Sequence, residues 1–218
     1  AGRFSRLTGL PPDPVFTLGK LLHMRRTDPT AWRRTRRFAL VHDYAANALG
    51  AERFVCDQAN ASLTGMLDAR RLAWSREILD AAGIREESLP ELVAPGTPIG
   101  TVSARAARLT GLPAGTPIVA GGGDQQCAGL GAGASRPGIA ALTLGTAAVP
   151  LCCTGRFVRD RRARLMSCVH ARPGSWEVEG LQNAAGSALQ WLSRALTGAE
   201  RFEDRDFKAA ERIPPGAE

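Results

Sequence analysis

The sequence has little lysine, few aromatic residues and no long uninterrupted hydrophobic run. Only two of the 28 basic residues are lysine, and aromatic residues make up 6% of the 218 residues. The arginines cluster at residues 25–37 and 156–164, but neither cluster alternates with the aromatic side chains on which single-stranded nucleic acid stacks. The net charge of +7 therefore indicates a solvated, arginine-rich surface, and no nucleic-acid partner is predicted.

The most continuous apolar stretch is too short and too interrupted to cross a bilayer. It covers residues 139–153 and contains Gly145, Thr146 and Pro150, whereas a spanning helix needs about 20 apolar residues. No secretory signal is visible near the first residue, so no membrane association is expected and the cytoplasm is the predicted location. The first residue is alanine, which indicates that the start of the gene product lies upstream.

The five cysteines do not form a metal-binding or disulfide motif. Their number is odd and no C-x-x-C pair occurs, so neither a zinc site nor a disulfide framework is predicted. Buried free thiols in a reducing cytoplasm are the expected state.

Local signals predict a helix-rich first half followed by a glycine-rich α/β core. Helices are expected where capping residues bracket an apolar pattern: from Pro29 after Asp28, from Ser75 to Gly83, from Ser103 to Gly111, and over residues 184–196. Residues 56–68 are expected to form a loop. Strands are predicted at residues 117–120, on either side of a turn at 145–146, and at 177–179.

Asp124 is the first candidate for chemistry. It follows a predicted strand and three glycines, which allow a substrate to approach the backbone because they carry no Cβ. A carboxylate at this place can accept a proton from a substrate hydroxyl. The alternative is an ordinary helix cap, since aspartate is favoured at that position.

A second candidate is the turn at Gly145 and Thr146. Exposed backbone N–H groups and a hydroxyl can hold a phosphate there, although a plain hairpin turn is the alternative. Neither G-x-G-x-x-G nor G-x-x-x-x-G-K-[ST] occurs in the sequence, so a dinucleotide-binding enzyme and a P-loop ATPase are both disfavoured.

Several segments together resemble the FGGY carbohydrate kinases. The segment GTPIVAGGGDQQ (residues 115–126) and the turn LGT (144–146) resemble the core of that family. CDQANASLTGMLD (56–68) is similar to its D-x-x-N-A-S-x-T segment, and GLQNAAGSALQW (180–191) to a segment that meets ATP. Two further positions match. Lys20 stands where the family has a helix lysine, and Asp43 with Tyr44 stands where the family has an Asp-Tyr pair.

The resemblance implies an actin-like, ribonuclease-H-like α/β fold of two domains, present here only in part. Residues 1–133 would be the C-terminal portion of the sugar-binding domain, and residues 134–218 the beginning of the ATP-binding domain, with a junction close to residues 124–138.

The same resemblance implies an ATP-dependent sugar kinase, most similar to xylulokinases. Asp124 would be the general base, and Gln125 and Gln58 would contact the substrate. Residues implied to contact ATP are Gly145, Thr146, Gly186 and Gln190. ATP with Mg²⁺ and a small sugar are the implied ligands, without a metal ligand from the protein, and a homodimer is one option for its assembly.

Two departures from the family pattern leave a second interpretation open. The D-x-G-T phosphate loop that opens the family and its late adenosine loop are both missing from this sequence. The chain therefore resembles the middle of a protein about twice as long, and the 218 residues alone are expected to be inactive. Gln58 replaces a tyrosine of glycerol kinases, which favours a pentulose over glycerol. The alternative is a non-catalytic or degenerate relative that only binds sugar.

Overall fold

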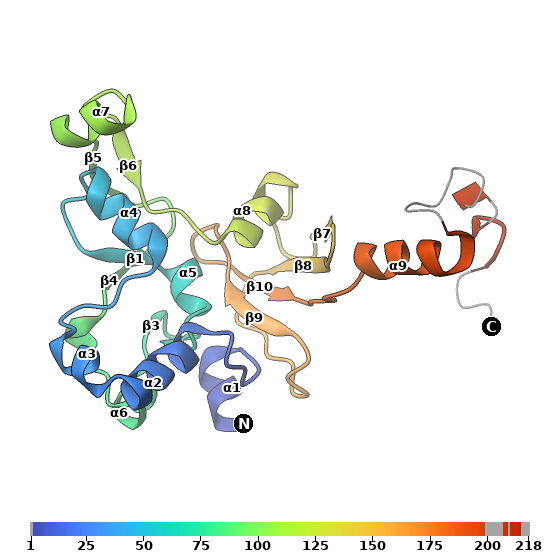
Figure 1. Ribbon diagram of the computed structural model, residues 1–218, viewed down its shortest axis with the longest axis horizontal. Helices are drawn as coiled ribbons and strands as arrows, with labels where there is room; N and C mark the ends of the chain where they lie inside the picture. The colour runs from blue at the N-terminus through green and yellow to red at the C-terminus, as the bar shows by residue number, and fades with distance from the viewer. Residues whose placement is uncertain (1, 199–206, 209, 215–218) are drawn as a thin grey trace. The chain divides into compact units, whose positions relative to one another are not determined.

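The computed structural model describes residues 2–198, 207–208 and 210–214 (Figure 1). The chain forms two compact units. The first contains the described residues up to Ala141 together with Leu151–Gly180, and the second contains Leu142–Pro150 and the described residues after Gly180. Among the described residues, no helix is both long and apolar enough to cross a membrane.

The first unit carries short helices, many of them ended by glycine. Its helices are α1 (Gly2–Thr8), α2 (Thr17–Thr27), α3 (Pro29–Arg34), α4 (Val41–Leu49), α5 (Gln58–Ser62), α6 (Arg76–Ala82), the 3₁₀ turn η1 (Glu86–Ser88), α7 (Ala104–Thr110) and α8 (Asp124–Gly131). Gly83 and Gly111 follow α6 and α7 in the left-handed conformation, which glycine adopts without a steric penalty. The predicted ends of these two helices are confirmed.

The strands are short and pair in small sheets. They are β1 (Val55–Asp57), β2 (Leu67–Asp68), β3 (Ala73–Trp74), β4 (Glu91–Val93), β5 (Pro98–Thr101), β6 (Pro117–Val119), β7 (Ala140–Leu144), β8 (Ala148–Thr154), β9 (Met166–Val169) and β10 (Trp176–Glu179). β1 pairs with β4 in parallel, while β2 pairs with β3 and β5 with β6 in antiparallel fashion. The largest sheet has the order β7-β8-β10-β9, and β10 runs antiparallel to both neighbours.

Two predicted features of the second half are confirmed, and both lie wholly or partly in the second unit. The strands β7 and β8 flank the turn at residues 145–146, as the apolar pattern predicted, and each strand lies partly in both units. Helix α9 (Gly186–Thr197) is amphipathic and is followed by Gly198 in the left-handed conformation.

The prediction of a loop over residues 56–68 is wrong. This segment contains β1, α5 and β2. Asp57 ends the strand and caps the helix, because its Oδ1 accepts a hydrogen bond from the Asn60 backbone N–H at 2.8 Å. Polar residues that look like a loop in the sequence are therefore a cap and the first turn of a short helix.

The core of the first unit consists of several apolar clusters. One of them joins α7 to the strands β1, β4, β5 and β6, and its buried residues are Val55, Val93, Ile99, Val102, Ala106, Ile118 and Ala120. All five cysteines are free, but the expectation of burial holds only for Cys56, Cys153 and Cys168. Cys127 is exposed on α8 and Cys152 is half-buried on β8, because they lie on the outer faces of their elements.

The N-terminus of α3 offers a test of the predicted caps. Asp28 Oδ1 accepts a hydrogen bond from the Ala31 backbone N–H at 2.8 Å, and Pro29 occupies the first helical position. We expect Asp28→Ala to lower the free energy of unfolding by about 0.5–2 kcal/mol, measured by urea denaturation. Asp28→Asn keeps an acceptor and should stay within a few tenths of the wild-type value; equal losses in both variants would contradict the capping role.

Candidate functional site

Asp124 is the first residue of α8, directly after the glycine-rich loop that follows β6. Its side chain is exposed, and its Oδ1 accepts a hydrogen bond from the Gln125 backbone N–H at 2.8 Å. Gly123, with extended backbone, occupies the N-cap position and provides no side-chain bond. The carboxylate therefore lies at the surface at a helix N-terminus, where the N–H groups and the helix dipole favour a negative charge.

The three glycines before Asp124 have different surroundings. A Cβ on Gly122 would lie 3.1 Å from Cβ of Ala171, and a Cβ on Gly123 would clash with the side-chain oxygen of Gln126 in the helix that follows. Gly121 has open space around it. The loop thus packs closely on the unit at Gly122, while Gly121 leaves room for another molecule to approach the backbone.

Buried polar side chains lie on α8 and on the neighbouring sheet. Gln126, His170 and Glu177 are each fully buried, and His170 Nε2 is 3.9 Å from Glu177 Oε2. Both side-chain polar atoms of Gln126 and both carboxylate oxygens of Glu177 have no hydrogen-bond partner. Buried polar atoms without partners are costly, so this cluster stores unfavourable energy within the first unit.

Burial raises the pKa values of two glutamates on β10, Glu177 and Glu179. Burial, together with the charge of Glu179, raises the pKa of Glu177 to about 8, although the Gln126 amide acts in the opposite direction. Burial, together with the charge of Asp124, raises the pKa of Glu179 to about 7. Glu177 therefore holds a proton at neutral pH, and Glu179 and Asp124 influence each other electrostatically.

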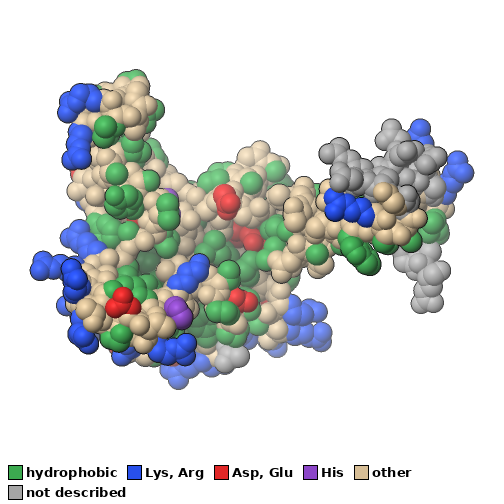
Figure 2. Space-filling model, in the orientation of Figure 1, with side chains coloured by type: hydrophobic (Ala, Val, Ile, Leu, Met, Phe, Trp, Pro, Cys, Tyr) green, Lys and Arg blue, Asp and Glu red, His purple; other side chains and the backbone are tan. Residues whose placement is uncertain are grey.

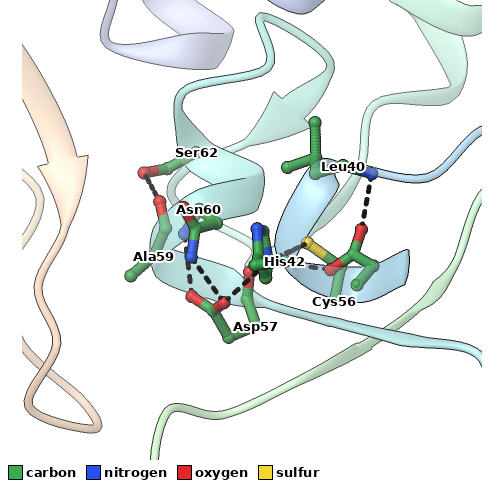
Figure 3. Close-up of polar contacts among 8 residues, drawn as sticks. Leu40, His42, Cys56, Asp57, Ala59, Asn60 and Ser62 are labelled. Carbon is green, nitrogen blue, oxygen red and sulfur yellow. Dashed lines mark hydrogen bonds and ion pairs between the residues drawn. The ribbon is translucent and has the colours of Figure 1, made fainter. Parts of the chain in front are cut away.

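A second group of polar residues lies where α4 meets β1 and α5 (Figure 3). We call it the His42 cluster, and its members are His42, Asp43, Cys56, Asp57 and Asn60. His42 Nε2 lies 2.7 Å from Asp43 Oδ1, 3.3 Å from Asp57 Oδ2 and 3.8 Å from Cys56 Sγ. Four of its members, all except Cys56, line a pocket of about 130 Å³ that also includes Gly121 and Gly122 of the glycine-rich loop.

The two carboxylates dominate the electrostatics of the His42 cluster. Burial lowers the pKa of His42, but Asp43 and Asp57 outweigh it and raise that pKa to about 9. Burial raises the pKa of the Cys56 thiol far above its usual value, and the same two carboxylates add to the effect. Without another cation, the imidazolium is therefore the positive charge that balances this pair of acids.

In the second unit, the turn at residues 145–146 packs against the N-terminus of α9. Gly145 O accepts a hydrogen bond from Gly186 N–H at 3.0 Å, and Thr146 O accepts one from Ala185 N–H at 2.9 Å. A Cβ on Gly186 would clash with Gly145 O, so glycine is needed there. The side chain of Gln190 is exposed one turn further along α9.

The predicted site residues fall into two sets. Asp124, Gln125 and Gln58 belong to the first unit, where Gln58 begins α5 and its Nε2 donates to Leu72 O at 3.4 Å. The second unit holds the residues predicted to contact ATP, and the structure brings three of them into one turn and helix start: Gly145, Thr146 and Gly186. The catalytic and binding roles assigned to these residues stay predictions.

Comparison with known proteins identifies the family. Residues 1–131, more than half of the chain, match the N-terminal domain of the FGGY family of carbohydrate kinases. The chain belongs to this family. An autoinducer-2 kinase from Escherichia coli (strain K12) is 31% identical over 212 residues, which cover 93% of this chain and 40% of that protein. An autoinducer-2 kinase from Yersinia enterocolitica is 33% identical over the same shares.

Solved structures of a xylulose kinase and a gluconate kinase have the same fold. The xylulose kinase from Rhodospirillum rubrum matches with a TM-score of 0.85 at 28% identity, over 98% of this chain and 44% of that one. Gluconate kinase from Lactobacillus acidophilus matches with a TM-score of 0.89, but at 23% identity this likeness concerns the fold alone. The predicted α/β sugar-kinase fold, present in part, is confirmed, and the chain spans about 40% of the relatives' length.

Sequence reasoning missed two groups of polar residues in this FGGY chain. The His42 cluster depends on contact between α4 and β1, which no local pattern indicates. For Glu177 and Glu179 the only signal was their spacing of two in a predicted strand, which places them on one face of β10. Figure 2 shows Lys and Arg side chains at several separate places on one face of the molecule, as expected for a solvated arginine-rich surface.

Proposed function

We propose that the protein transfers the γ-phosphate of ATP to a hydroxyl of a small sugar, with Asp124 as the general base. The observation that carries this proposal is the exposed Asp124 carboxylate at the start of α8, after a glycine-rich loop, in a chain of the FGGY carbohydrate kinase family. Gln125 and Gln58 are the proposed substrate contacts. Asp124 would accept the hydroxyl proton as the oxygen attacks phosphorus, and Mg²⁺ would accompany ATP and neutralise phosphate charge.

The proposed nucleotide contacts are Gly145, Thr146, Gly186 and Gln190. All four are exposed, so a nucleotide can reach them without unfolding the second unit. We place residues 1–133 in the sugar-binding domain and residues 134–218 at the beginning of the ATP-binding domain, which accords with the match of the family's N-terminal domain to residues 1–131. Because ATP is a cytoplasmic substrate, we also place the protein in the cytoplasm.

A pentulose such as xylulose is the proposed substrate class, because glutamine at position 58 differs from the tyrosine of glycerol kinases. The test is ADP release by the full-length protein with Mg²⁺, ATP and a panel of xylulose, autoinducer-2, gluconate and glycerol. We expect the highest kcat/KM with xylulose. Turnover of none of these, with sugar binding retained, would favour the alternative of a non-catalytic sugar-binding relative. We expect no turnover from the 218 residues alone.

The turn at Gly145 provides a test of the proposed nucleotide contacts. A Cβ on Gly145 would meet only Ala147 O, at 4.0 Å, so Gly145→Val fits the fold and any effect reports on an approaching ligand. We expect it to weaken ATP binding by about tenfold or more, equivalent to roughly 1.4 kcal/mol, whereas Thr146→Ser keeps the hydroxyl and should change little. Titration calorimetry with full-length protein measures both, and equal ATP affinity in the two variants would contradict the proposal.

A further inference from the structure

Side chains of the His42 cluster bring nitrogen, oxygen and sulfur donors together. His42 Nε2, Asp43 Oδ1 and Cys56 Sγ all lie within 4.8 Å of one another, and Asp57 Oδ2 is 3.3 Å from the same imidazole nitrogen. The residues come from two separate elements, since His42 and Asp43 begin α4 whereas Cys56 and Asp57 belong to β1. Figure 3 shows His42 beside Cys56 and Asp57. Donor atoms from two elements, with His42 and Cys56 14 residues apart in the sequence, therefore lie close together.

Hydrogen bonds hold both carboxylates of the cluster in place. Asp43 Oδ2 accepts from the Leu40 backbone N–H at 2.9 Å, whereas Asp43 Oδ1, on a side chain that is only 1% exposed, lies 2.7 Å from His42 Nε2. Both oxygens of Asp57 accept hydrogen bonds at 2.8 Å from the backbone and side chain of Asn60. Metal-binding carboxylates are oriented by partners of this kind, and the bond from Leu40 keeps Asp43 Oδ1 directed at the imidazole.

We propose that His42, Asp43 and Cys56 form a binding site for a zinc ion, with the Asp57 carboxylate beside it. The donor set supports zinc over magnesium or calcium, because imidazole and thiolate are ligands of zinc while the two lighter ions prefer oxygen alone. Three protein ligands leave the fourth position of a tetrahedral ion to a water molecule. It goes beyond the proposed kinase function and does not depend on it.

The distances between the donor atoms suit a tetrahedral ion. Zinc bonds of about 2.0–2.3 Å place neighbouring ligand atoms about 3.3–3.8 Å apart in a tetrahedron. The observed distance of 3.8 Å from His42 Nε2 to Cys56 Sγ agrees with this. The distance from His42 Nε2 to Asp43 Oδ1 is 2.7 Å. This distance has to lengthen when both atoms bind one ion instead of contacting each other.

Charge and access also favour a divalent cation at this point. Asp43 and Asp57 are two buried carboxylates side by side, and zinc would replace the imidazole proton and the thiol proton, which are released to solvent as the two bonds form. His42 is 40% exposed at its side chain, and the pocket that it lines together with Asp43 and Asp57 gives an ion a path to the two carboxylates. Bound zinc would hold the start of α4 in contact with β1 and α5.

Metal substitution in the purified full-length protein tests the site. Dialysed wild-type protein is titrated with Zn²⁺ and, separately, with Co²⁺, whose bond to a thiolate gives a charge-transfer band in the near ultraviolet. We expect one equivalent of tightly bound zinc, a higher Tm in its presence and a cobalt–thiolate band. Because zinc binding stabilises the folded state by mass action, Tm should rise with zinc concentration.

Variants separate this site from adventitious binding. Cys56→Ser should abolish the cobalt–thiolate band and weaken zinc binding by about 100-fold or more, while Cys127→Ser, which alters an exposed thiol outside the cluster, should behave as wild type. His42→Asn provides a second loss variant should Cys56→Ser fold poorly. Absence of the band in wild type, or equal zinc affinity in wild type and a folded loss variant, would overturn the proposal.

Discussion

Asp124→Asn in the full-length protein is expected to lower turnover by about 10²–10⁴-fold, the usual contribution of a general base, if the proposed kinase activity is present. This corresponds to roughly 3–5 kcal/mol of activation free energy at about 1.4 kcal/mol per factor of ten. Asparagine keeps the size of the side chain and most of its hydrogen bonding, but it cannot take the proton of the sugar hydroxyl. ATP affinity should stay nearly unchanged, because Thr146, Gly186 and Gln190 are untouched.

The result distinguishes catalysis from a purely structural role. The N-cap of α8 is Gly123, so the alternative of a capping Asp124 is wrong. Its side chain accepts only the local bond from the Gln125 backbone N–H, which the amide oxygen of asparagine can also accept. Asp28→Asn is the matched control, because Asp28 also lies at a helix N-terminus and does cap α3; it should leave turnover unchanged. Near-normal turnover in Asp124→Asn would remove Asp124 from the mechanism.

Glu177→Gln is expected to remove much of the loss of stability that occurs as pH rises. The pKa of Glu177 is raised from 4.5 to about 8 by burial and by Glu179. Below pH 4.5 both the folded and the unfolded chain hold this proton; above it the unfolded chain releases the proton first. Stability therefore falls as pH rises from about 4.5 to about 8, by at most about 5 kcal/mol at 1.36 kcal/mol per pKa unit.

Urea denaturation of both proteins between pH 5 and pH 9 measures this effect. Glutamine does not ionise, so the variant should have a flatter pH profile and a higher free energy of unfolding at pH 7 than wild type. Glu87→Gln, at an exposed residue of η1, serves as the control and should reproduce the wild-type profile. Parallel profiles for wild type and Glu177→Gln would show that Glu177 ionises equally easily in both states.

Where a local rule decides the structure, the sequence was sufficient. Asp28 followed by Pro29 predicted the start of α3, and Gly83, Gly111 and Gly198 predicted helix ends, because each of these residues acts on its immediate neighbours. The strands on either side of residues 145–146 followed from two apolar runs. The local pattern also placed Asp124 after a strand and three glycines at the start of a helix, where the structure has it.

Where pairing with a distant segment decides, the sequence was not sufficient. β1 is only three residues long and pairs with β4, more than 30 residues later, so residues 56–68 were predicted to be a loop. On β10 the usual pattern is reversed, since Glu177 and Glu179 are buried and Val178 between them is only half-buried. The His42 cluster was missed for the same reason, because two elements must fold before its donors meet.

The return of the chain to the first unit has a consequence for the order of folding. Residues 151–180 supply β9 and β10, and Val169 N–H donates to Ser62 Oγ while Trp176 Nε1 donates to Ala69 O, each bond across 107 residues. Such long sequence separations slow folding, because a large loop must close first. During synthesis, the first unit therefore cannot complete its packing until the ribosome has passed Gly180, and any excised version of it must extend that far.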